Sequence, residues 1–264
     1  MEFQNIKALL LDMDGVLWKD NTPIIDLPRA FKEIESLGCL ALLATNNSML
    51  SRQDYVIKLQ NFGVNISEKQ IYNSGYATAA YLKRRFPSGG SVFVVGEPGL
   101  VKSMEAAGFS VGERNAVAVV VGIDRHITYN KINTAMRLVR AGSVFIGTNP
   151  DKTFPTPDGI APGAGSIIAA VETACEKEPV IIGKPSPIIF EMAIREHNLL
   201  PHETLMVGDR LDTDILGGQR AGCKTALVLS GITCAEDIHN WQPQPDIISD
   251  NLQSLLELLS TWKR

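Results

Sequence analysis

The fold of this 264-residue chain is decided by the stretch LLDMDGVL at residues 10–17. The apolar run that leads into it, 6–11, is interrupted only by Lys7 and predicts a buried strand of a parallel sheet. Asp12 and Asp14 then lie at the carboxyl end of that strand, where open α/β sheets bind their ligands. Two carboxylates this close repel each other unless a cation lies between them, so a divalent ion such as Mg²⁺ is a candidate ligand. Asp and Gly are also common in turns, so this stretch alone leaves an ordinary turn open.

The composition excludes several classes of function. The chain is 45% hydrophobic and 20% charged, as in ordinary globular proteins. A net charge of −4 without a Lys/Arg-rich run argues against a nucleic-acid partner. Every apolar run falls well short of the roughly 20 residues that span a bilayer, so we expect no membrane partner. The cysteines are scattered without C-x-x-C spacing, which predicts reduced thiols and a cytoplasmic location.

Strand-like and helix-like patterns alternate along the whole chain, from the apolar run 6–11 to an amphipathic segment at 252–262. This alternation predicts an α/β fold with a Rossmann-like, mostly parallel sheet covered by helices on both faces. The segment 148–163 holds four prolines and is predicted to be a long loop. Loops of that length in compact domains are often functional.

Polar residues follow the next predicted strand as well. Residues 43–48 read LATNNS, in which Thr45, Asn46 and Asn47 come between an apolar strand and a helix. Hydroxyl, amide and backbone N–H groups at such a position can bind phosphate oxygens. The same residue types also cap helices and make turns, so the motif taken alone is weak.

Two later segments repeat the arrangement. Residues 182–187 read IGKPSP and place Lys184 between a short strand and a helix, where a point charge suits a phosphoryl group. A surface lysine is the alternative. Residues 206–215 read MVGDRLDTDI, with Asp209 directly after the strand and Asp214 five residues later. An acid in this segment can cap the following helix, but Asp209 abuts the strand and is hard to explain as a cap.

Together the four motifs resemble those of the haloacid dehalogenase (HAD) superfamily. The matching elements are D-x-D-G-V-L at 12–17, Thr-Asn-Asn at 45–47, the Gly-Lys-Pro lysine at 183–185 and G-D-x-x-x-x-D at 208–214. With their strands, these motifs cover most of the chain. The resemblance implies a HAD-like catalytic core with the four motifs at one edge of its sheet.

The spacing of the motifs narrows this resemblance. The interval between Asp12 and Thr45 is too short for a domain, whereas that between Asn47 and Lys184 far exceeds one βα unit. The chain is therefore similar to the NagD-like subgroup, which includes p-nitrophenyl and phosphoglycolate phosphatases and carries an α/β cap domain at this point. We expect a core formed by 1–79 and 180–264 and a C2-type cap at 80–179.

The resemblance also implies the chemical roles of the acids. Asp12 is the nucleophile that forms an aspartyl-phosphate, and Asp14 is the acid that protonates the leaving alcohol and then activates water. Mg²⁺ is held by the Asp12 carboxylate, the Asp14 backbone carbonyl and Asp209. Asp214 supports the water shell of the metal. An ionised Asp12 is consistent with this assignment, because Mg²⁺ and a neighbouring lysine both favour the anion.

The remaining motif residues are implied to bind phosphate. Thr45, Asn46 and Lys184 hold the phosphoryl oxygens, with Asn47 nearby. The cap is implied to choose the substrate, and we expect the stretch around Asp151 and Phe154 to contact the leaving group. Packing in the core of the cap is the alternative for Phe154.

The function implied by the resemblance is Mg²⁺-dependent hydrolysis of a small phosphorylated metabolite, in which a phosphoric monoester bond is broken. Dimers through the cap occur in the subgroup, so a homodimer is a further expectation. Two alternatives remain open. A phosphotransferase or mutase would pass the phosphoryl group from the same aspartate to a sugar or alcohol. A non-enzymatic phospho-acceptor, like a receiver domain, would only bind it.

Overall fold

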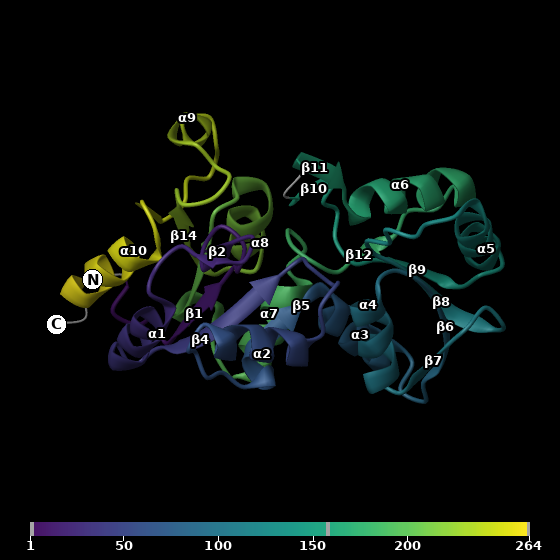
Figure 1. The fold of residues 1–264 in the computed structure, drawn as a ribbon, viewed down its shortest axis with the longest axis horizontal. Helices are drawn as coiled ribbons and strands as arrows, with labels where there is room; N and C mark the ends of the chain where they lie inside the picture. Colours follow the sequence, from purple (N-terminus) through teal and green to yellow (C-terminus); the bar gives the residue numbers. More distant parts are fainter. Residues whose placement is uncertain (1–2, 157–158, 263–264) are drawn as a thin grey trace. The chain divides into compact units, whose positions relative to one another are not determined.

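The computed structural model describes residues 3–156 and 159–262, which form two compact units (Figure 1). Unit 1 contains the described residues up to 45, then 55–72, then those from 184 onward. Unit 2 contains 46–54 and the described residues of 73–183. Each unit has its own parallel sheet, so the predicted α/β class is confirmed.

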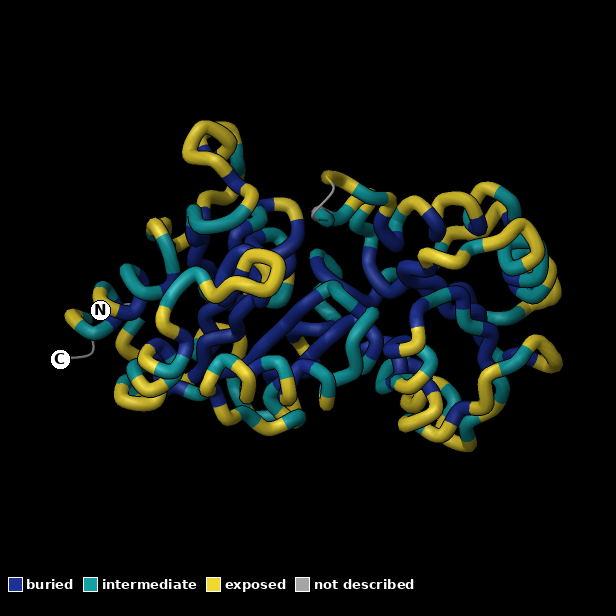
Figure 2. Tube along the Cα trace, viewed as in Figure 1, coloured by how far each residue is buried: buried dark blue, intermediate teal, exposed yellow. Residues whose placement is uncertain are grey.

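The sheet of unit 1 has six strands in the order β15-β14-β13-β1-β4-β5. Its central strand, β1, pairs in parallel with β13 on one side and β4 on the other. The strands of this unit are β1 (Ala8–Leu11), β2 (Trp18–Lys19), β3 (Thr22–Pro23), β4 (Leu40–Thr45), β5 (Ile71–Asn73), β13 (Thr204–Gly208), β14 (Lys224–Val228) and β15 (Ile247–Ser249). All four residues of β1 are buried, as expected for an apolar strand covered on both faces. Figure 2 shows the inner strands in the colour of buried chain.

Helices pack around this sheet. They are α1 (Leu27–Ser36), α2 (Arg52–Asn61), α7 (Ile188–Glu196), α8 (Leu216–Arg220), α9 (Ala235–Ile238) and α10 (Leu252–Trp262), with a π-helical turn η3 (Leu211–Ile215) and short 3₁₀ turns η1 (Glu68–Gln70) and η2 (Pro201–Glu203). The start of α1 shows how the sequence sets a helix boundary. Asp26 accepts the backbone N–H of Arg29, and Pro28 lies in the first turn, where its missing N–H costs no hydrogen bond.

The sheet of unit 2 has five strands in the order β12-β9-β8-β6-β7, all paired in parallel. Its elements are α3 (Ser74–Arg85), β6 (Gly90–Val95), α4 (Pro98–Ala106), β7 (Phe109–Val111), β8 (Ala116–Val121), α5 (Tyr129–Arg140), β9 (Val144–Gly147), α6 (Ala164–Cys175) and β12 (Val180–Ile181). The apolar strand β8 runs through the middle of this sheet, and side chains from α5 and α6 complete the core cluster. The predicted insert, 80–179, falls within the range of this unit.

The segment predicted as a long loop, 148–163, contains two antiparallel strands instead, and its residues 157 and 158 lie outside the described residues. Its strands are β10 (Thr153–Thr156) and β11 (Gly159–Pro162). Prolines argue against a central strand because they lack an N–H donor, but both strands of an isolated ribbon are edges, where proline is tolerated. Among the described residues, no helix is long and apolar enough to cross a membrane.

Candidate active site

Three of the predicted site residues reach one end of the sheet of unit 1 because parallel strands end at the same edge. Asp12 follows β1, and its backbone N–H continues the ladder to Val207 of β13 at 2.8 Å. Asp209 follows the last residue of β13, and Thr45 is the last residue of β4. Lys184 joins them from the chain that returns to unit 1.

The carboxylates of Asp12, Asp209 and Asp214 form a buried acidic cluster. One oxygen from each lies within 4.8 Å of the others, and all three residues are buried. Asp209 Oδ2 accepts the backbone N–H of Ile232 at 2.8 Å, whereas its Oδ1 has no hydrogen-bond partner among the described residues. A buried carboxylate oxygen without a partner is costly. Three convergent oxygens therefore fit a hard cation such as Mg²⁺ or Ca²⁺.

Lys184 is the positive group inside this cluster. It is 2% exposed, and its Nζ lies 2.6 Å from Asp12 Oδ1 and 2.6 Å from Asp214 Oδ1. The same ammonium donates to the carbonyl oxygen of Ala44 at 3.0 Å. Burial lowers the pKa of Lys184, but the charges of Asp12 and Asp214 outweigh it and hold that pKa above its ordinary value. The lysine is therefore charged, and one positive charge faces three acids.

The pKa values of Asp12 and Asp209 are both raised, by burial and by the neighbouring acids. Burial raises the pKa of Asp12 well above its ordinary value, and the charges of Asp214 and Asp209 add to this, while Lys184 opposes it. Burial and the neighbouring charge of Asp214 raise the pKa of Asp209 to about 7. A second cation in the cluster would relieve both shifts by favouring the ionised forms.

The loop after β13 holds Asp214 in place. Its Oδ2 accepts the backbone N–H groups of Asp209 at 3.2 Å and Arg210 at 3.1 Å, so the π-helical turn aims the other oxygen at Lys184. Asp212, the acid with a possible capping role, instead pairs with Arg210 near the surface at 2.9 Å. The two acids of this segment thus have different surroundings.

Gly15 allows the loop after β1 to pass close to the cluster. Its φ is +88°, which side chains rarely adopt, and a Cβ there would lie 2.5 Å from the Asp209 carboxyl carbon. The loop carries Asp14, which is exposed, although the atoms crowding its carboxyl desolvate it in part and raise its pKa. Trp18 Nε1 donates to Asp14 Oδ1 at 3.0 Å, a contact that sequence analysis missed.

The other predicted residues belong to unit 2. Asn46 Nδ2 donates to Asp151 Oδ2 at 3.1 Å, and the Asn46 carbonyl accepts from Asn149 Nδ2 at 2.8 Å. Asn47 Oδ1 accepts the backbone N–H of Met49 at 2.9 Å in a local turn. Phe154 is half-buried and packs against the apolar core of the unit. A role for these side chains in binding phosphate or choosing substrate stays a prediction.

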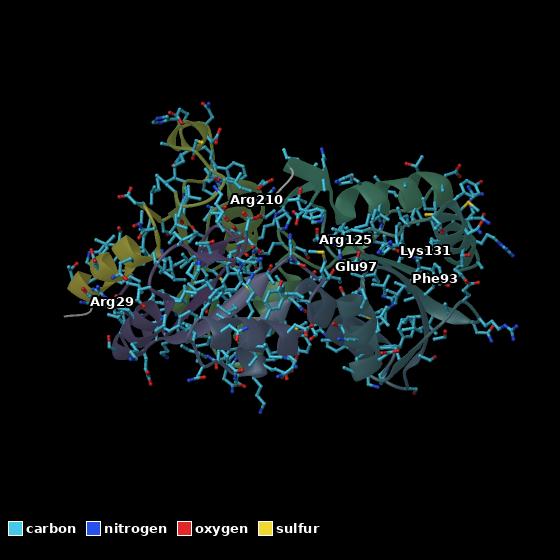
Figure 3. All side chains as sticks on the ribbon, in the orientation of Figure 1. Arg29, Phe93, Glu97, Arg125, Lys131 and Arg210 are labelled. Carbon is cyan, nitrogen blue, oxygen red and sulfur yellow. The ribbon has the colours of Figure 1, made fainter. Side chains whose placement is uncertain are left out.

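Unit 2 has charged groups of its own beyond the ends of β6 and β8. Glu97 accepts from the guanidinium and the backbone N–H of Arg125, each at 3.0 Å, and Figure 3 shows the two labelled residues side by side. Asp124 pairs with Lys131 at 2.6 Å. The hydrogen bonds from Arg125 hold the pKa of Glu97 below its ordinary value. Each acid here has its own cation, so this group has no surplus charge that would attract a metal.

Comparison with known proteins places these residues in a family pattern. A family model described as haloacid dehalogenase-like hydrolase matches residues 9–110, a range that includes Asp12, Asp14 and Thr45. A second model, described as HAD-hydrolase-like, matches residues 181–255, which include Lys184 and Asp209. Together the two models cover the acidic cluster, with Asp12 in the first and Asp209 and Asp214 in the second.

Individual relatives match over nearly the whole chain. Glycerol-3-phosphate phosphatase from Gallus gallus is 35% identical over 97% of this chain and 92% of its own length. The structure of NagD from E. coli K-12 superposes with a TM-score of 0.86 at 34% identity, covering 94% of this chain and 97% of that one. A glycerol phosphate phosphatase from Mycobacterium tuberculosis, solved in complex with magnesium, gives a TM-score of 0.89 at 30% identity, covering 96% and 78%.

Proposed function

This chain belongs to the haloacid dehalogenase-like hydrolase family, in the group of NagD, and we propose that it hydrolyses small phosphomonoesters through an aspartyl-phosphate. The observation that carries the proposal is the buried contact of Lys184 with Asp12 at 2.6 Å inside the cluster of Asp12, Asp209 and Asp214. An ionised carboxylate at this position can attack a phosphoryl group, and the neighbouring ammonium can share the negative charge of that group.

The first half of the reaction uses Asp12 and Asp14. An Asp12 oxygen forms the new bond to phosphorus as the bond from phosphorus to the leaving oxygen breaks. Asp14 gives its proton to that oxygen, because an alkoxide is a poor leaving group without one. Lys184 neutralises part of the negative charge on the phosphoryl oxygens in a site from which water is largely excluded.

The second half regenerates the enzyme. Asp14, now a carboxylate, takes a proton from water as the water oxygen attacks phosphorus and the bond to Asp12 breaks. Phosphate leaves, and both acids return to their starting state. Thr45, Asn46 and Asn47 are proposed to hold phosphoryl oxygens during both halves, because hydroxyl and amide groups at a strand end suit that task.

The metal proposed for this site is Mg²⁺. Asp12, Asp209 and the backbone carbonyl of Asp14 would hold it, with Asp214 supporting its water shell, and the unpartnered Oδ1 of Asp209 supports this choice. When bound, such an ion neutralises charge on the transferring phosphoryl group and orients it. Asp151 and Phe154 in unit 2 are proposed to select the leaving group.

Phosphate release tests the proposal. The purified protein is incubated with p-nitrophenyl phosphate, glycerol phosphate, phosphoglycolate, a sugar phosphate, a nucleoside monophosphate and pyridoxal phosphate, with Mg²⁺ or with EDTA. We expect Mg²⁺-dependent release that EDTA abolishes, with one metabolite preferred. Release that is unaffected by EDTA would contradict the metal site. Phosphate transfer to an added alcohol in place of water would favour a phosphotransferase.

A further inference from the structure

The indole of Trp18 lies in the interior of unit 1 and is aimed at Asp14. Trp18 is fully buried, and its Nε1 donates to Asp14 Oδ1 at 3.0 Å. The backbones of the two residues form an isolated β-bridge, and the Gly15 N–H donates to the Trp18 carbonyl at 2.8 Å. Trp18 is therefore held near Asp14 by contacts of its backbone and of its side chain.

Two side chains of the α2 region contact the indole. Lys58 Nζ lies 4.2 Å from the centre of the Trp18 ring and also donates to the carbonyl oxygen of Asp20 at 3.3 Å. The ring of Phe62 packs on the indole at a centroid distance of 5.8 Å. A cation over the face of an indole is attracted to its electron density, and this helps to hold the ring in one orientation.

The chemistry of the indole makes the two oxygens of Asp14 different. The N–H of tryptophan is a donor only, so Asp14 Oδ1 must act as the acceptor. In a protonated carboxyl group the carbonyl oxygen is the better acceptor, and the proton is on the other oxygen. When Asp14 is protonated, the contact from Trp18 therefore favours the form that carries the proton on Oδ2.

We propose that Trp18 is a positioning residue that holds Oδ1 of Asp14, so that the proton given to the leaving oxygen comes from Oδ2. The inference rests on the proposed function, because it takes Asp14 to be the general acid. In the step concerned, the Asp12–phosphorus bond forms, the bond from phosphorus to the leaving oxygen breaks, and that oxygen gains the proton as the O–H bond at Oδ2 breaks. Trp18 itself neither gives nor takes a proton.

The quality of the leaving group separates this role from a purely structural one. An alkyl phosphate such as glycerol phosphate needs the proton, because it would otherwise expel an alkoxide. p-Nitrophenyl phosphate needs little help, because p-nitrophenolate is a stable anion near neutral pH. Damage to the delivery of the proton therefore reduces kcat/KM for glycerol phosphate selectively, whereas general damage to the site reduces kcat/KM for both substrates.

The test is Trp18→Phe, which keeps an aromatic ring in the pocket but removes the donor. We expect kcat/KM for glycerol phosphate to fall about tenfold and that for p-nitrophenyl phosphate by less than about twofold, since general acid catalysis as a whole contributes about 10²–10⁴. Phe62→Leu is the matched control, because it disturbs packing on the same indole and leaves its N–H in place. We expect Phe62→Leu to change kcat/KM by the same factor for both substrates.

Asp14→Asn separates failure of this inference from failure of the proposed function. If Asp14→Asn shows the selective loss and Trp18→Phe does not, the positioning role of Trp18 is wrong and the acid role of Asp14 stands. If Asp14→Asn lowers kcat/KM equally for both substrates, Asp14 is not the general acid, and the inference about Trp18 is wrong as well. Should Trp18→Phe fail to fold, 3-benzothienylalanine placed at position 18 keeps the shape of the indole without its N–H, and the same selective loss is expected.

Discussion

Units 1 and 2 both place acidic side chains beyond the carboxyl ends of parallel strands, but they neutralise them differently. In unit 2, Glu97 pairs with Arg125 and Asp124 pairs with Lys131, so each acid has one cation. The cations are the exposed members of these pairs, with Arg125 63% exposed. In unit 1, the cluster has three acids, and the buried ammonium of Lys184 contacts two of them, Asp12 and Asp214.

The pKa shifts of the two regions run in opposite directions. The hydrogen bonds from Arg125 lower the pKa of Glu97, whereas burial and the charge of Asp214 raise that of Asp209 to about 7. One-to-one pairing satisfies the acids of unit 2 and leaves them a structural role. Acids that outnumber their cation in a buried place are poised to bind another cation. An acid at a strand end thus indicates a site when its neighbours supply too little positive charge and its pKa is raised.

The largest expected effect comes from removing one acid in each region. Asp12→Asn removes the attacking oxygen charge, so we expect turnover to fall by at least about a thousandfold, as when a nucleophile is lost. Glu97→Gln, the matched change in unit 2, should leave turnover within about twofold, because it touches no reacting group. Phosphate release measures both, with circular dichroism to establish that each variant is folded. Similar losses in the two variants would break the comparison.

Removing the cation of each region is the second test. Lys184→Met leaves Asp12 and Asp214 buried without their partner, which costs roughly 3–5 kcal/mol in the free energy of unfolding. Arg125→Met should cost clearly less, because the removed guanidinium is 63% exposed and Glu97 keeps its hydrogen bond from the backbone N–H of residue 125. Urea unfolding of both variants, in EDTA, gives the two values. A smaller loss for Lys184→Met than for Arg125→Met would contradict the account.

The pH dependence of stability is a third, smaller effect. Asp209 titrates near 3.8 when unperturbed and near 7 in the folded protein. Between these values the folded state binds more protons than the unfolded state, so metal-free stability decreases as the pH rises from about 4 to 7. Mg²⁺ favours the ionised form and offsets this loss.

Thermal unfolding with Mg²⁺ or EDTA at pH 6 and pH 8 measures the effect. We expect Mg²⁺ to raise the Tm more at pH 8 than at pH 6, because at pH 6 a proton competes with the metal for Asp209. In Asp209→Asn the difference between the two pH values should shrink. An equal Mg²⁺ effect at both pH values in the wild type would argue against Asp209 as a ligand.

The smallest effect is expected from Arg125→Gln. The replacement keeps a polar side chain near Glu97 and removes a charge that lies mostly in solvent. We expect no measurable change in Mg²⁺-dependent turnover and only a small change in Tm. A large loss of turnover in this variant would show that the charged groups of unit 2 contribute to the reaction, and would contradict the proposed difference between the two units.

The sequence carries the parts of the site that depend on strand ends. The apolar run 6–11 predicts β1, and parallel pairing alone brings the residues after β1, β4 and β13 to one edge. The clustering of Asp12 and Asp209 follows from that rule. The place of Lys184 beside them was implied by the resemblance to a family, because the strand before it, β12, belongs to the sheet of unit 2. The inferences about Asp12 and Asp209 need only the period of a strand and the direction of its neighbours.

Other features depend on geometry that no local pattern encodes. The contact of Trp18 with Asp14 requires the positive φ of Gly15 and the loop that it allows. Glu97 precedes the first residue of α4, but its carboxylate makes no cap hydrogen bond there and accepts instead from Arg125, 28 residues away in the chain. The strands β10 and β11 were not predicted, because prolines argue against a strand. A single dihedral angle decided the first of these outcomes, and a partner distant in the sequence decided the second.

The most direct test of the central claim is a rapid-mixing experiment with Asp14→Asn, p-nitrophenyl phosphate and Mg²⁺. Asp12 can still displace the good leaving group, but the water that frees the enzyme is no longer activated by Asp14. We predict a rapid burst of p-nitrophenolate equal to the enzyme concentration, then slow release, with the phosphoryl group found by mass spectrometry on the peptide that contains Asp12. No burst, and no phosphorylated Asp12 while turnover continues, would contradict the aspartyl-phosphate account.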